Sequence, residues 1–123
     1  MRRYVFVVAF FAMAHTSIAQ LLKTIPEFPT DNSAVSVIAD FTKGNQGLLN
    51  YANTNDVYVH IGVITNLSTN NSDWKYVKFT WATADPNARA TLIGANKYKF
   101  DIANIRTFFG VPAGETIKKI AIL

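Results

Sequence analysis

Two aromatic residues, Trp74 and Tyr76, alternate in the run WKYVKFTW, directly after the polar loop TNLSTNNSD. Alternation predicts that both rings lie on one face of a strand. A flat ring can stack on the apolar C–H surface of a sugar, as aromatic side chains stack on other flat groups. The neighbouring loop supplies polar groups for the sugar hydroxyls, namely Asn66, Asn70 and Asp73. This pattern predicts an open carbohydrate site with a Kd of about 0.1 to 1 mM.

The same two rings have a second interpretation, because Trp and Tyr are favoured in strands whatever their function. Trp74 and Tyr76 could equally pack against a neighbouring domain, and the sequence leaves both alternatives open. Trp81 ends the same run but follows the alternation of Val77 and Phe79. That alternation predicts that Trp81 belongs to the core.

Neither a metal site nor a catalytic site is indicated. Zinc sites use three or four His, Cys or carboxylate ligands, whereas the chain has no cysteine and His60 is its only histidine beyond residue 19. His60 is interpreted as a strand residue, and no serine has a nucleophile-elbow pattern. The acids fall in loops, at strand ends or on polar strand faces, which indicates solvated charge rather than a catalytic pair. These acids are Glu27, Asp31, Asp40, Asp56, Asp73, Asp85, Asp101 and Glu115. We predict no catalytic residue, no metal and no cofactor.

Five strand-length runs must position these side chains. They are residues 34–41 (AVSVIADF), 56–64 (DVYVHIGVI), 74–81 (WKYVKFTW), 97–102 (KYKFDI) and 116–123 (TIKKIAIL), with a weaker run at 21–28 (LLKTIPEF). Apolar residues on both faces of the 56–64 run predict a central strand. Only ANIRTFFGV, residues 103–111, favours a short helical turn.

The connections between these runs are rich in Asn, Thr, Gly and Pro, which favours turns. Short strands separated by such turns predict an all-β, immunoglobulin-like antiparallel β-sandwich. The last run reaches the end of the sequence, so we expect the sandwich to lack its final strand or strands.

The first 19 residues have the pattern of a secretory signal peptide. Arg2 and Arg3 precede the apolar run YVFVVAFFAMA, and small residues precede Gln20 at the positions that signal peptidase reads. The apolar run is shorter than the ~20 residues of a membrane-spanning helix. We therefore expect residues 20–123 to form one exported module, secreted or held at the cell surface or in the periplasm, with no membrane contact after cleavage.

The charge of the chain gives no support for nucleic-acid binding. Removing residues 1–19 takes away two arginines and no acid, so the net charge falls from +4 to +2. The remaining cations are dispersed, whereas nucleic-acid binding favours a basic stripe. We exclude DNA and RNA as partners. Without cysteine, the module also depends on its apolar core rather than on disulfides.

Three stretches, VYVHIGVIT, DWKYVKFTWAT and FFGVPAGETIKKIAIL, resemble the N-terminal immunoglobulin-like module of secreted bacterial alpha-amylase-type glycoside hydrolases of family 13. The similarity runs from about Leu21 to Leu123. In such proteins a hairpin, a final strand and the catalytic barrel follow. The resemblance implies a non-catalytic accessory role in an enzyme acting on alpha-glucan, through contact with the glucan or packing against the catalytic domain. The alternative is an exported protein-interaction or adhesion module without carbohydrate affinity.

Overall fold

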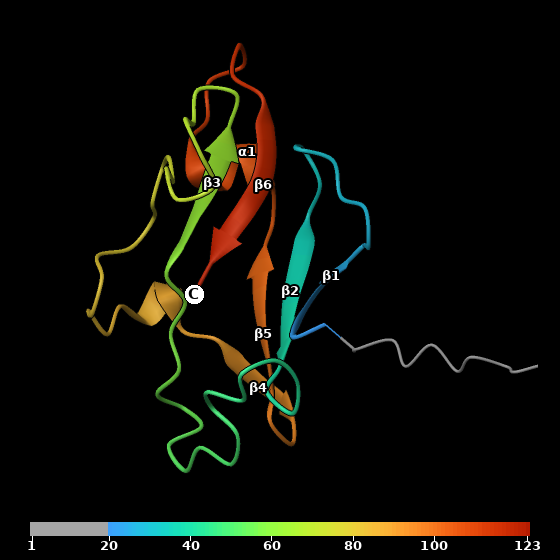
Figure 1. Ribbon diagram of the computed structural model, residues 1–123, viewed down its shortest axis with the longest axis vertical. Helices are drawn as coiled ribbons and strands as arrows, with labels where there is room; N and C mark the ends of the chain where they lie inside the picture. Colours follow the sequence, from blue (N-terminus) through green and yellow to red (C-terminus); the bar gives the residue numbers. More distant parts are fainter. Residues whose placement is uncertain (1–19) are drawn as a thin grey trace, which may run out of the picture.

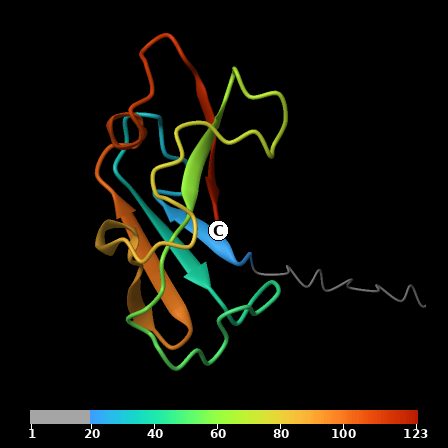
Figure 2. The same ribbon diagram turned by 90° about the vertical axis from the view of Figure 1, so that its left-hand side faces the viewer.

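The computed structural model describes residues 20–123, and the predicted signal peptide lies outside the described residues. The regular elements are β1 (Leu22–Ile25), β2 (Val35–Asp40), β3 (Ile61–Thr65), the 3-10 turn η1 (Pro86–Ala88), β4 (Thr91–Gly94), β5 (Lys97–Ile102), α1 (Ile105–Phe109) and β6 (Ile117–Ile122). A four-stranded sheet has the order β1-β2-β5-β4, and β3 and β6 form a second sheet (Figure 1). Figure 2 shows the two sheets as separate layers. The predicted all-β sandwich is confirmed.

The strand order is that of an immunoglobulin constant-type sandwich. Such a sandwich has strands A, B, E and D in one sheet and C, F and G in the other. Taken in chain order, β1 to β6 occupy positions A to F, and every pairing between them is antiparallel. Within residues 20–123, no strand pairs with the edge of β6 that faces away from β3.

Alternate side chains of β2 and β5 are buried and form one side of the core. Tyr98, Phe100 and Ile102 of β5 are buried while Lys97 and Asp101 are exposed, as the sequence predicted. The main core cluster spans both sheets and α1; its buried members are Val35, Ile61, Val63, Phe79, Ala88, Phe100, Ile102, Ile105, Phe109 and Val111. Burying such side chains is the dominant favourable term in folding.

All five residues of β3 are buried, in agreement with the central strand predicted for this run. On one side β3 pairs with β6. On the other side it meets the segment 75–78, because Val63 and Lys75 exchange backbone hydrogen bonds of 2.9 and 2.8 Å and Lys78 N donates to Ile61 O at 3.0 Å. The strand begins at Ile61, so His60 lies just before it.

Two strand assignments differ from the sequence prediction. The run 74–81 forms no regular strand, because Tyr76 adopts a left-handed φ of 53° that interrupts the alternation. The predicted core face of this run is therefore wrong in part: Phe79 is buried, but Val77 is 44% and Trp81 64% exposed. Strand β4 was not predicted, since all four of its residues are exposed and give no alternating pattern.

The predicted helical turn at residues 103–111 is confirmed as α1. Asn104 caps its start, with the side-chain oxygen accepting from Thr107 N at 2.9 Å. Gly110 ends it in the left-handed conformation, with φ of 69°. Within the described part of the chain, no helix is long and apolar enough to cross a membrane.

Candidate functional site

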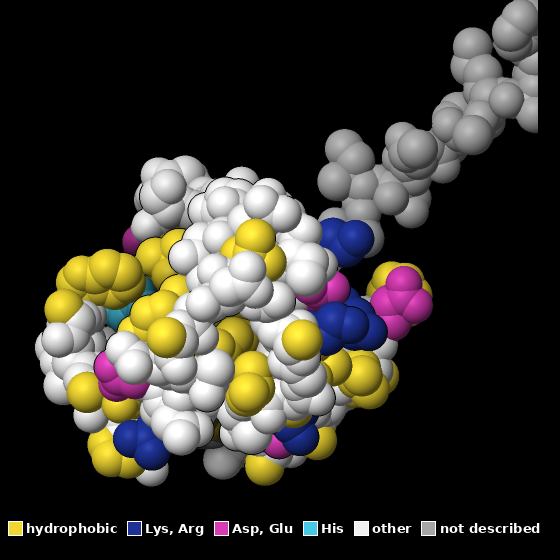
Figure 3. All heavy atoms as spheres, turned by 90° about the horizontal axis from the view of Figure 1, so that it is seen from below, with side chains coloured by type: hydrophobic (Ala, Val, Ile, Leu, Met, Phe, Trp, Pro, Cys, Tyr) yellow, Lys and Arg dark blue, Asp and Glu magenta, His cyan; other side chains and the backbone are white. Residues whose placement is uncertain are grey.

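Two tryptophans meet one histidine at the start of β3, and we call Trp74, His60 and Trp81 the aromatic cluster. The rings of Trp74 and His60 are stacked with centroids 5.8 Å apart. The Trp81 ring lies at 81° to the same imidazole, with centroids 5.0 Å apart. Figure 3 shows a histidine at the surface with hydrophobic side chains beside it.

Gly62 allows the cluster to form. A Cβ atom at this position would lie 3.1 Å from Lys75 O, 3.2 Å from a Val77 methyl carbon and 3.5 Å from Trp74 Cβ. The first two distances are shorter than ordinary van der Waals contact. The absence of a side chain therefore lets the segment that carries Trp74 lie close against β3, next to His60.

Trp81 is the exposed member of the cluster. It lies in a turn whose next residue, Ala82, has a left-handed φ of 59°. Its side chain borders a hollow of about 380 Å³ formed by Asp56, residues 58–60, residues 80–84 and Leu123. Asp56, Thr80 and Thr83 line this hollow and are exposed. The arrangement offers a flat apolar ring beside exposed carboxylate and hydroxyl groups.

Trp74 and Tyr76, the rings predicted to contact sugar, are half-buried and bonded to other parts of the protein. The Trp74 indole N–H donates to Asn71 O at 3.2 Å. The Tyr76 hydroxyl donates to the carboxylate of Glu115. Both rings come from one segment, but their polar atoms are directed to the protein rather than to solvent.

The three predicted polar residues organise the loop in which they lie. Asp73 accepts from the backbone N–H of Thr69 at 2.9 Å and pairs with Lys75 at 3.1 Å, so its pKa is lowered, chiefly by the Thr69 hydrogen bond. The Asn70 side-chain oxygen accepts from Ser72 N at 2.8 Å. The Asn66 side-chain oxygen accepts from Thr116 N at 2.8 Å and joins this loop to the start of β6. Their role in carbohydrate binding stays a prediction.

Glu115 was predicted to be solvated, and this prediction is wrong, because the residue is only 7% exposed. Its carboxylate accepts from Thr65 Oγ1 at 2.6 Å and from the Tyr76 hydroxyl. These two hydrogen bonds, that of Thr65 first, lower the pKa of Glu115, and the bond to the carboxylate raises the pKa of Tyr76. Glu115 thus fixes the segment 74–76 against the end of β3.

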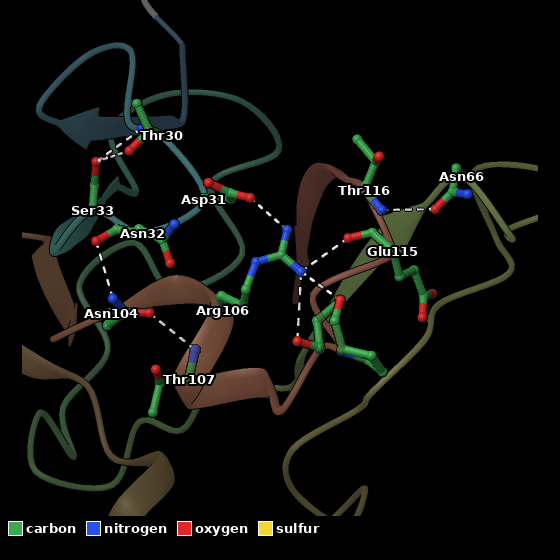
Figure 4. A network of polar contacts seen from close by, with 12 residues as sticks. Thr30, Asp31, Asn32, Ser33, Asn66, Asn104, Arg106, Thr107, Glu115 and Thr116 are labelled. Atoms are coloured by element: carbon green, nitrogen blue, oxygen red, sulfur yellow. Dashed lines mark hydrogen bonds and ion pairs between the residues drawn. The ribbon is translucent and has the colours of Figure 1, made fainter.

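Arg106 of α1 holds the loop that carries Glu115 (Figure 4). Its guanidinium donates to Pro112 O at 2.7 Å and to Glu115 O at 2.9 Å, and it pairs with the carboxylate of Asp31. The ion pair lowers the pKa of Asp31, chiefly through the hydrogen bond from Arg106. A chain of contacts therefore runs from α1 through Glu115 and Tyr76 to the segment that carries Trp74.

The carboxyl groups whose pKa is shifted take part in contacts within the module. Every described carboxyl group with a shifted pKa has it lowered, which keeps the group ionised at neutral pH; these are Asp31, Asp40, Asp73, Asp101 and Glu115. A general acid in glycoside hydrolysis needs the opposite shift. Among residues 20–123, no group of three His, Cys, Asp or Glu side chains could hold a metal ion.

Neither a scan against protein-family models nor a search of curated proteins found a match for this chain.

Proposed function

We propose that this chain is a non-catalytic accessory module of a secreted glycoside hydrolase that acts on alpha-glucan, and that it contacts the polysaccharide. The observation that carries the proposal is the aromatic cluster, in which an exposed indole lies against the sandwich beside polar groups. Rigid aromatic surfaces suit sugars because a flat ring covers the C–H face while its neighbours hydrogen-bond the hydroxyls. The resemblance to alpha-amylase-type N-terminal modules supports alpha-glucan as the polysaccharide.

Affinity electrophoresis through gels containing soluble starch tests this function. A gel without polysaccharide and a gel containing hydroxyethyl cellulose serve as controls. We expect retardation in starch alone, by an amount that grows with the starch concentration. Equal mobility in all three gels at millimolar glucose equivalents would contradict glucan contact.

A second candidate function, packing against a protein partner, is favoured by another region of the module. The outer edge of β6 has no strand partner within residues 20–123, and residues of β6 and β1 line a hollow of about 710 Å³. Ile25 and Phe28 line that hollow and are 55% and 86% exposed. Open strand edges with apolar neighbours tend to pair with other chains or domains.

A catalytic domain of the same enzyme is one partner that would cover this region, and a separate adhesion partner is the alternative. Replacing both Ile25 and Phe28 by Ser distinguishes this function from glucan contact. We expect the double variant to keep its retardation in starch gels but to lose association with a partner domain. Loss of starch retardation in this variant would contradict the separation of the two regions.

A further inference from the structure

We infer that Trp81, rather than Trp74, is the surface on which the sugar stacks, and that the sugar lies in the hollow formed by Asp56, residues 58–60 and residues 80–84. This inference rests on the proposed glucan contact and assigns its site. It concerns a neutral hexopyranose unit within a glucan chain. Trp81 was expected in the core, so the sequence alone pointed away from this site.

The exposure of the two indoles separates their roles. Trp81 is 64% exposed, whereas Trp74 is half-buried with one face stacked on His60 and its N–H bonded to Asn71 O. A sugar can therefore cover the Trp81 ring without displacing a protein contact. The Trp81 ring stays joined to the cluster, because it lies roughly perpendicular to the His60 ring at a centroid distance of 5.0 Å and His60 in turn stacks on Trp74.

The polar side chains near the two indoles also differ in how far they are available to a ligand. Those near Trp74 are engaged, since Asp73 accepts from Thr69 and pairs with Lys75. Those in the hollow beside Trp81 are the exposed side chains of Asp56, Thr80 and Thr83. One carboxylate and two hydroxyls can accept from and donate to sugar hydroxyls, as is usual in sites that combine an apolar surface with a few polar groups.

A proline-rich peptide is the other extended ligand that docks on aromatic surfaces. Such peptides bind in grooves lined by aromatic rings. In this hollow Trp81 is exposed, whereas the other aromatic rings, Tyr58 and His60, are half-buried. Three exposed oxygen-bearing side chains around a single platform match a polyhydroxylated ring better. The geometry therefore favours a saccharide.

Titration with maltoheptaose, followed by tryptophan fluorescence, tests the assignment on residues 20–123. The variants are Trp81→Ala, the conservative Trp81→Phe and Asp56→Ala, with Phe28→Ala as the matched control because it removes an exposed aromatic ring from the other hollow. Thermal unfolding of each variant verifies that it is folded. Because removing Trp81 also removes a reporter, isothermal calorimetry with the same sugar accompanies the titration.

We expect Trp81→Ala to weaken binding by about tenfold or more, since one lost aromatic stacking contact corresponds to roughly that factor. Trp81→Phe should retain part of the affinity, Asp56→Ala should weaken binding by roughly two- to tenfold, and Phe28→Ala should leave it unchanged. Saturable binding that survives Trp81→Ala would overturn the assignment but leave the proposed function intact. No binding of maltoheptaose by the unaltered module would overturn the glucan contact itself, as would binding of a proline-rich peptide in its place.

Discussion

Replacing Gly62 by Ala tests whether the close approach of segment 74–77 to β3 builds the aromatic cluster. The added Cβ would lie 3.1 Å from Lys75 O, a backbone atom held by its hydrogen bond to Val63 N. It would also lie 3.2 Å from a methyl carbon of Val77. The methyl group belongs to an exposed side chain and can rotate, but Lys75 O cannot move away without disturbing the pairing of this segment with β3. Overpacking of this kind costs about 1 to 3 kcal/mol.

The expected loss corresponds to a drop in Tm of roughly 4 to 24 °C, at about 4 to 8 °C per kcal/mol for a domain of this size. Differential scanning calorimetry measures it, and near-UV circular dichroism reports the packing of the two tryptophans. Gly94→Ala is the matched control, since nothing lies within 4 Å of its added Cβ. We expect the free energy of unfolding of that control to lie within about 1 kcal/mol of that of the original chain, and its Tm to be equal or slightly higher. A Gly62→Ala variant that has the same Tm as Gly94→Ala and an unchanged near-UV spectrum would show that the close approach at Gly62 does not build the cluster.

Three further predictions concern the polar network and the N-terminus. Arg106→Met removes the hydrogen bonds to two carbonyls and the ion pair with Asp31, so urea denaturation should show a loss of about 2 to 4 kcal/mol; an unchanged midpoint would contradict this. The lowered pKa of Glu115 contributes stability that is fully present above the pKa of the unfolded chain and is lost as the pH falls through the folded value. Glu115→Gln should therefore flatten part of the acid limb of a plot of Tm against pH, and a limb of unaltered slope would count against it. Mass spectrometry of exported protein should find a chain that begins at Gln20, and a chain that begins at Met1 would exclude cleavage after Ala19.

The strands that the sequence predicted well are those whose side chains alternate across one buried face. In β5, Tyr98, Phe100 and Ile102 are buried between exposed or half-buried neighbours, so the pattern is local and can be read without knowing the fold. Strand β3 was predicted as central because both faces are apolar. In contrast, β4 is exposed throughout, and only its pairing with β5 identifies it as a strand.

The parts that the sequence did not predict depend on contacts between distant residues. Glu115 is buried and accepts hydrogen bonds from Thr65 and Tyr76, which lie 50 and 39 positions earlier in the chain. No local pattern reveals such contacts. Trp81 is exposed although Phe79, two positions earlier, is buried, because Trp81 lies in a turn with the left-handed Ala82, where a non-glycine residue is uncommon. The sequence therefore identified the segment that carries both indoles, but it could not tell which of the two faces solvent.

The proposed contact of Trp81 with glucan is tested most directly by the indole N–H signals of an ¹⁵N-labelled module. The chain contains two tryptophans, so the spectrum has two such signals, which Trp81→Phe assigns. On addition of maltoheptaose, the Trp81 signal should shift progressively and saturate, while the Trp74 signal, whose N–H is bonded to Asn71 O, should move far less. A saturating shift of the Trp74 signal with Trp81 unmoved, or no shift of either signal at millimolar sugar, would contradict the proposed site.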